Sequence, residues 1–242
     1  MLKQLLFYLV VFLTNIVQCI TGFAGTVLAM PFSVMLVGIA TAKPILNILG
    51  IAASVGVLIK NYKYVDKKEF LKIVGVMGIG IIGGLFVSGD ITKSERLVHI
   101  LLGLVVIIFA VYNAVLFFTK KEKEPNKYVS IIILIASGII HGIFVCGGPL
   151  LVTYAASKMK DKQQFRATLS AVWIVLNSVI LISNLHDGMI TKQLLPQIAI
   201  SLVILVGAVI IGEKIAKKMN KELFLILSYA LMFISGASLI LS

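Results

Sequence analysis

The chain has 242 residues, of which 60% are hydrophobic and only 13% are charged, and its formal net charge is +12. Soluble domains are about 45–50% apolar and about 25% charged, so a soluble fold would leave much apolar surface in water. We therefore predict an integral membrane protein with room for about eight spans of roughly 20 residues. Nucleic-acid binding is excluded, because the basic residues lie in short breaks between apolar runs and form no continuous face.

Eight apolar runs follow one another along the chain. They cover residues 3–38, 45–60, 70–89, 97–118, 128–157, 167–184, 192–212 and 222–241. Helix is the expected structure of each run, because lipid offers no partners for unpaired backbone groups. The first run could pass for a signal peptide, but we interpret it as the first helix. The breaks between the runs are short, which predicts no extramembrane domain.

Two of the runs, 3–38 and 128–157, are too long for one membrane helix and short for two full ones. Glycines interrupt both runs near the middle, in residues 21–26 of the first and residues 146–149 of the second. We predict that each run forms a helical hairpin, which returns to the side of the membrane from which it entered.

The distribution of basic residues favours these hairpins. If each of the two long runs crossed the membrane once, the 22 lysines and arginines would divide 11 to 11 between the two sides. With two hairpins the division is 17 to 5, the kind of asymmetry that the positive-inside rule expects. We therefore expect a multi-pass plasma-membrane protein with its major basic loops in the cytoplasm and both ends of the spanning region outside. Two short complete crossings per run would give the same division.

The hairpins also divide the chain into two similar halves. Each hairpin precedes three further spans, and Gly22 falls opposite Gly142 when the halves are aligned. We predict an all-α fold of two structural repeats, residues 1–123 and 124–242. The first hairpin enters from outside and the second from the cytoplasm, so the repeats would have inverted topology, as in many secondary transporters.

The glycine-broken tips of the hairpins are candidate anion sites. In the second run, Gly147 and Gly148 predict a tight turn, and Pro149 suits the first position of a new helix. The N-terminus of that helix would direct unpaired N–H donors and partial positive charge at the turn. The alternative is that the glycines only allow close helix packing. The corresponding residues of the first run are Thr21, Gly22, Gly25 and Thr26.

Other residues near the tips have two interpretations. His141, next to Gly142, is either a neutral histidine bonded to a backbone carbonyl or a ligand donor or proton-coupling group. Cys146 is explained equally well by apolar packing and by contact with a ligand. Three amide side chains either bond between helices or line a site: Gln18, Asn47 and Asn177.

The ionisable residues argue against other chemistry. No charged residue lies deep in any run, which disfavours a carboxylate proton relay or a cation site. Two cysteines, and three histidines without a deep acidic partner, predict no metal site, no cofactor and no enzyme. Trp173 is assigned to packing, and Arg166 to the cytoplasmic edge of its helix.

Three segments of the chain carry a family resemblance: the glycine-rich residues 18–31, residues 138–149 and residues 165–177. They resemble the TauE/SafE family, the sulfite-exporter-like membrane permeases, and the hydropathy layout is similar over essentially the whole chain. Val145 departs from the family, which often has glycine there, and the first segment lacks a full Gly–Gly pair. The resemblance implies secondary transport of small anions, often sulfur oxyanions or organosulfonates.

Our leading hypothesis is thus a permease or exporter of a small anion, bound near the midplane between the two tips. Its expected partners are the anionic solute and the lipid bilayer, and a homodimer is left open. The alternatives are a permease for a small carboxylate, and a membrane structural or assembly factor that transports nothing.

Overall fold

The computed structural model describes residues 2–21, 24–119, 126–159, 161–216 and 221–241, and within them every regular element is helical. A short 3₁₀ turn, η1 (Tyr62–Tyr64), follows the third helix. The α-helices are α1 (Leu2–Thr21), α2 (Ala24–Val37), α3 (Ile39–Asn61), α4 (Lys67–Ile91), α5 (Glu95–Thr119), α6 (Lys127–Phe144), α7 (Gly148–Lys158), α8 (Lys162–His186), α9 (Leu195–Ala216) and α10 (Lys221–Leu241).

The described helices have the length and composition of membrane spans. Seven of them, α1, α3, α4, α5, α6, α8 and α9, are long enough and apolar enough to cross a bilayer, and α10 contains the shorter apolar stretch Tyr229–Leu241. Large apolar side chains such as Phe86, Ile108 and Val203 are exposed on their outer faces. Lipid is the solvent that such faces need, so the prediction of an all-helical multi-pass membrane protein is confirmed.

Both long apolar runs are broken into two helices. The first run forms α1 and α2, and the second forms α6 and α7, with the breaks at the expected positions. In each pair the first helix is the longer: α1 has 20 residues and α2 has 14, while α6 has 18 and α7 has 11. At 1.5 Å per residue, α2 and α7 reach only about 21 and 16 Å, too short to cross a hydrocarbon core of about 30 Å.

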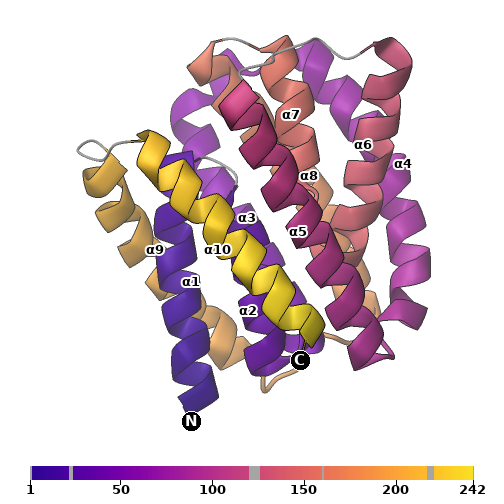
Figure 1. Cartoon of the computed structure of the whole chain (residues 1–242), viewed down its shortest axis with the longest axis vertical. Helices are drawn as coiled ribbons and strands as arrows, with labels where there is room; N and C mark the ends of the chain where they lie inside the picture. The colour runs from indigo at the N-terminus through magenta and orange to yellow at the C-terminus, as the bar shows by residue number, and fades with distance from the viewer. Residues whose placement is uncertain (1, 22–23, 120–125, 160, 217–220, 242) are drawn as a thin grey trace.

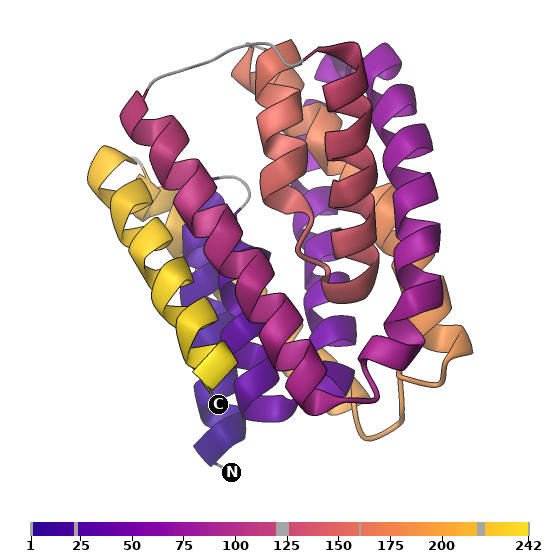
Figure 2. The same ribbon diagram turned by 45° about the vertical axis from the view of Figure 1, so that its right-hand side comes forward.

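The two hairpins open toward opposite ends of the molecule. Figure 1 shows the start of α1 at the end where both termini lie, whereas α6 starts at the other end. In Figure 2 the turn between α6 and α7 lies inside the body of the molecule, well short of the end that holds the termini.

Glycines hold the second hairpin tightly against α4. The added Cβ of an alanine at Gly80 would overlap the backbone oxygen of Ile135, and one at Gly138 would overlap that of Met77. Gly84 and Gly142 continue the same contact one turn further along. Close packing of this kind is the usual use of small residues between membrane helices, and it brings the backbones of α4 and α6 into direct contact.

Helix α3 runs antiparallel to α8 through the centre of the molecule, where Asn47 Nδ2 donates to the backbone oxygen of Asn177 at 3.1 Å. The predicted span 45–60 begins too late: α3 starts at Ile39, directly after Gly38, whose φ of 74° suits glycine. The early start puts Lys43 inside α3 with only 2% of its surface exposed. Protein, and not water, therefore surrounds a lysine that lies one turn from the start of α3.

Candidate functional site: a central cavity between the hairpins

A cavity of about 760 Å³ lies between the two hairpins and helices α3, α8 and α9. The first hairpin lines it with Gln18 and Thr26, and the second with His141, Val145 and Gly148. The volume falls within the usual range for small-molecule sites of about 300–1,000 Å³. Two segments far apart in the sequence therefore meet at one solute-sized space.

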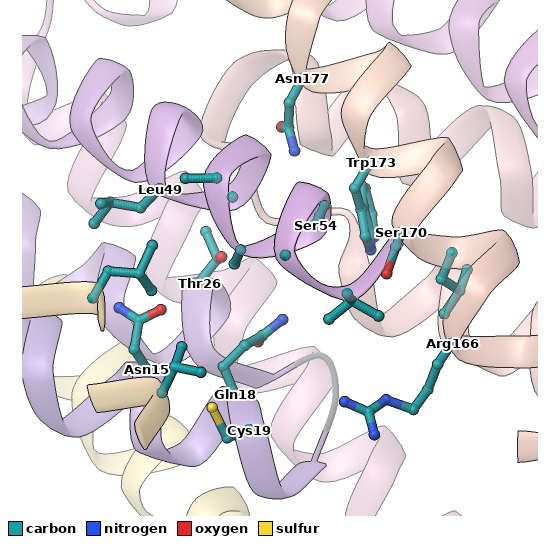
Figure 3. Close-up of a pocket in the computed structure, with 18 of the residues that line it drawn as sticks. Asn15, Gln18, Cys19, Thr26, Leu49, Ser54, Arg166, Ser170, Trp173 and Asn177 are labelled. Carbon is teal, nitrogen blue, oxygen red and sulfur yellow. The ribbon is translucent and has the colours of Figure 1, made fainter. Parts of the chain in front are cut away.

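The walls of the cavity are mostly apolar, with polar groups grouped along α1 and α8. Figure 3 shows the Gln18 amide and the Arg166 guanidinium extending toward the same space from opposite walls, with Ser170 and Trp173 side by side on α8. Lys60 and Glu213 are the other charged lining residues among those described. The charged side chains thus give two cations and one carboxylate, a balance that favours an anion.

His141 connects the tip of the second hairpin to α8. Gly147 N–H donates to His141 Nδ1 at 3.3 Å, so the ring proton sits on Nε2. Nε2 then donates to Asn177 Oδ1 at 3.0 Å. The Asn177 oxygen is occupied in this way, while its Nδ2 group has no hydrogen-bond partner among the described residues and Asn177 lines the cavity. His141 therefore orients the Asn177 amide at the cavity wall.

The sharp turn between α6 and α7 has further local support. Val145 adopts a left-handed conformation with φ of 57°, and its N–H donates to the His141 oxygen at 2.7 Å, which ends α6. Ser137 Oγ donates to the Gly147 oxygen at 2.7 Å. Pro149 stands in the first turn of α7, as expected. Hydrogen bonds thus satisfy much of the backbone where the chain turns at membrane depth.

The first hairpin has a related bond at its edge. Gly25 N–H donates to Gln18 Oε1 at 2.7 Å, which joins the last part of α1 to the first turn of α2. An added Cβ at Gly25 would lie 2.6 Å from Gln18 Cβ, so a larger residue would displace that amide. Gly25 therefore positions Gln18, which itself lines the cavity.

The structure brings five of the twelve predicted site residues to the cavity wall: Gln18, Thr26, His141, Gly148 and Asn177. Gly22 and the side chain of Thr21 lie outside the described residues. The other five are close to the cavity without lining it: Gly25, Asn47, Gly142, Cys146 and Gly147.

Those five residues lie behind the residues that line the cavity. Gly142 packs on α4, and a Cβ at Gly147 would overlap the Ser137 oxygen, so both glycines serve close packing. Asn47 bonds between helices, and Cys146 is fully buried in the apolar core. In the structure these five residues contact neighbouring parts of the protein and do not line the cavity.

Sequence reasoning missed several lining residues on α8. Arg166 was assigned to topology and Trp173 to packing, yet both line the cavity, and the Trp173 ring also lies 4.8 Å from the His141 ring. Together with Ser170 and Asn177 they recur at the spacing of one helical face, which was the available signal. The remaining polar or sulfur-bearing residues that were missed are Asn15, Cys19, Ser54, Lys60, Asn61 and Glu213.

Among the described residues, no group of three or more His, Cys, Asp or Glu side chains could hold a metal ion. The arrangement can instead bind a small polar solute through amide, indole, hydroxyl and guanidinium donors. Fold and cavity together thus define a multi-pass membrane protein with a solute-sized site between two broken-helix hairpins.

Comparison with known families gives the same class a name. The chain matches the family described as sulfite exporter TauE/SafE over residues 7–239, and it belongs to that family. It is accordingly a membrane permease or exporter. Searches of curated proteins and of solved structures found no match.

Proposed function

We propose that this protein is a secondary transporter of a small anion, and that a sulfur oxyanion or organosulfonate is its substrate. The observation that carries the proposal is the central cavity, to which both hairpins contribute and where Arg166 faces the Gln18 amide. Guanidinium binds oxyanions in bidentate fashion, and amide and indole N–H groups add neutral donors. The family description, which names sulfite export, supports the sulfur chemistry.

The packing of the helices supports inverted repeats as the basis of transport. If α1 to α5 are matched in order with α6 to α10, the packed pair α4–α6 corresponds to α9–α1, and α4–α8 corresponds to α9–α3. The pairs α3–α8 and α5–α10 join corresponding helices. An exchange of this kind is what a two-fold axis in the membrane plane requires, and such repeats allow the two halves to exchange conformations around a fixed site.

The direct test is flux into proteoliposomes of radiolabelled sulfite, thiosulfate, a sulfonate and a small carboxylate. We expect wild-type protein to move at least one sulfur anion. Arg166→Gln should lower its flux about tenfold to a hundredfold, because a hydrogen bond to a charged group contributes about 1.5–3 kcal/mol.

Arg96→Gln is the matched control, because Arg96 is exposed at the start of α5, away from the cavity. Its flux should equal that of the wild type. Preference for the carboxylate would support the carboxylate permease instead, and silence toward every anion would support a structural or assembly role. Equal flux in Arg166→Gln and wild type would contradict the proposed site.

A further inference from the structure

Lys43 is a buried cation that forms no direct ion pair with a described carboxylate. It lies one turn inside α3 with 2% of its surface exposed, and no described carboxylate is within ion-pairing distance of its ammonium. A lysine that only marks topology extends its ammonium into water, which this burial prevents. Ionisable groups at membrane depth are costly, and they mark solute or ion routes.

At the level of Lys43, two asparagines have side-chain amide atoms without hydrogen-bond partners. Asn184 on α8 is 1% exposed, and neither its Oδ1 nor its Nδ2 has a hydrogen-bond partner. Asn47 Oδ1, one turn from Lys43 on α3, is also buried without a partner. Buried side-chain amides are nearly always bonded, so unmet groups in one place mark a position where a polar solute can bond.

These residues continue the polar face of the cavity outward. On α3, Lys43 and Asn47 lie on the same face as the lining residues Gly50 and Ser54, because the spacings are four, three and four residues. On α8, Asn184 lies two turns beyond Asn177 on the face that also carries Ser170 and Trp173. The bond from Asn47 to Asn177 sets the register that brings the two stripes together.

A charge interaction reaches the outer end of this seam, where Lys43 interacts electrostatically with Asp187. Asp187 itself accepts from Ser183 Oγ at 3.2 Å and is half-exposed at the C-cap of α8. The seam thus lies toward the start of α3 and the end of α8, whereas Lys60 and Arg166 lie at the opposite ends of these two helices.

We infer that the α3–α8 seam around Lys43 and Asn184 is a second oxyanion-binding station, closed in this conformation, on the outer half of the transport route. This inference rests on the proposed anion transport. When the seam opens, Lys43 supplies the charge and Asn184 Nδ2 supplies an amide donor for the same oxyanion that occupies the central cavity. In the closed state Asn184 Nδ2 has no hydrogen-bond partner among the described residues, whereas Asn47 Nδ2 is held by the Asn177 oxygen.

The test compares Lys43→Gln, Lys43→Arg and Asn184→Leu with wild type for sulfite flux in proteoliposomes, and also for thermal unfolding and sulfite binding in detergent. Lys43→Gln should lower flux by about tenfold or more, as expected for loss of a desolvated charge contact, and Lys43→Arg should retain most of it. Both neutral variants should unfold at the wild-type temperature or above, since each removes an unsatisfied buried group, and sulfite binding at the Arg166 cavity should persist.

Lys192→Gln is the control, because Lys192 is an exposed lysine in the loop after α8 and its loss removes the same charge. Wild-type flux in Lys43→Gln overturns the inference while the proposed function stands. If Lys43→Gln does not fold, Asn184→Leu decides: reduced flux supports the station, and full flux overturns it. If wild-type protein moves no anion, the proposed function and this inference both fail.

Discussion

At the scale of single residues, His141 shows how a buried polar group organises this site. Both of its ring nitrogens are bonded, one to the Gly147 N–H and the other to Asn177 Oδ1. The ring therefore contributes orientation: it ties the tip of one hairpin to α8 and turns the Asn177 amide nitrogen toward the cavity. Neither interpretation made from the sequence included this arrangement, since the histidine bonds to a backbone N–H and a side-chain amide.

Replacing His141 should weaken both the fold and the site. His141→Leu leaves Gly147 N–H and Asn177 Oδ1 without partners, at a cost of about 1–3 kcal/mol for each group. We expect a lower unfolding temperature in detergent together with weaker sulfite binding. His186→Leu is the control, because the His186 side chain is 89% exposed, and it should match the wild type in both measurements. An unchanged unfolding temperature in His141→Leu would show that the ring bonds contribute little.

At the scale of helices, the chain uses glycine for two purposes. At Gly38 it supplies a backbone conformation with positive φ between α2 and α3. Along α4 and α6 it lets two backbones approach until no side chain fits between them, as at Gly80 and Gly138. The second hairpin consequently packs closely against α4.

Two glycines of α4 give opposite predictions for replacement by alanine. Gly80→Ala should destabilise the protein by about 1–3 kcal/mol, because the added Cβ overlaps the backbone of α6. Gly78→Ala, where nothing lies within 4 Å of the added Cβ, should be neutral or stabilising by up to about 1 kcal/mol, because alanine favours helix. Thermal unfolding of the two variants measures the difference. Equal stability would mean that α4 and α6 are not packed as described.

At the scale of the whole molecule, the two hairpins determine on which side each loop lies. Since each hairpin returns to its own side, η1 and the loop between α8 and α9 fall at opposite ends of the molecule (Figure 1). If each long run crossed the membrane once, these two loops would share a side. The positions of the loops therefore distinguish the two topologies more directly than the charge count.

Single cysteines test this topology in a background with Cys19 and Cys146 replaced by alanine. Thr191→Cys, exposed between α8 and α9, should react with a membrane-impermeant maleimide on intact cells. Tyr62→Cys, 62% exposed in η1, should react only after the membrane is opened, because its loop carries basic residues, which the positive-inside rule places in the cytoplasm. Labelling of both positions from one side would contradict the hairpins, and the reverse pattern would invert the orientation.

Hydropathy and glycine placement alone determined the membrane class, the helical runs and the positions where two of them break. These properties are local, because lipid obliges each segment to pair its own backbone, whatever surrounds it. Of the residues predicted for the site, several that adjoin a break line the cavity, as with Gln18, Thr26, His141 and Gly148. Its extension along α8 escaped prediction, because which face of a helix meets a cavity depends on its neighbours.

Tertiary structure decided the remaining features. It placed Arg166 and Trp173 on the cavity wall. It placed Gly142 and Gly147 in close packing contacts away from that wall. It also buried Lys43, which interrupts an apolar run in the sequence but lies inside α3 against α8. In a hydropathy profile a lysine marks the end of an apolar span. Only the packing of other helices around Lys43 shows that its surroundings are protein and not water.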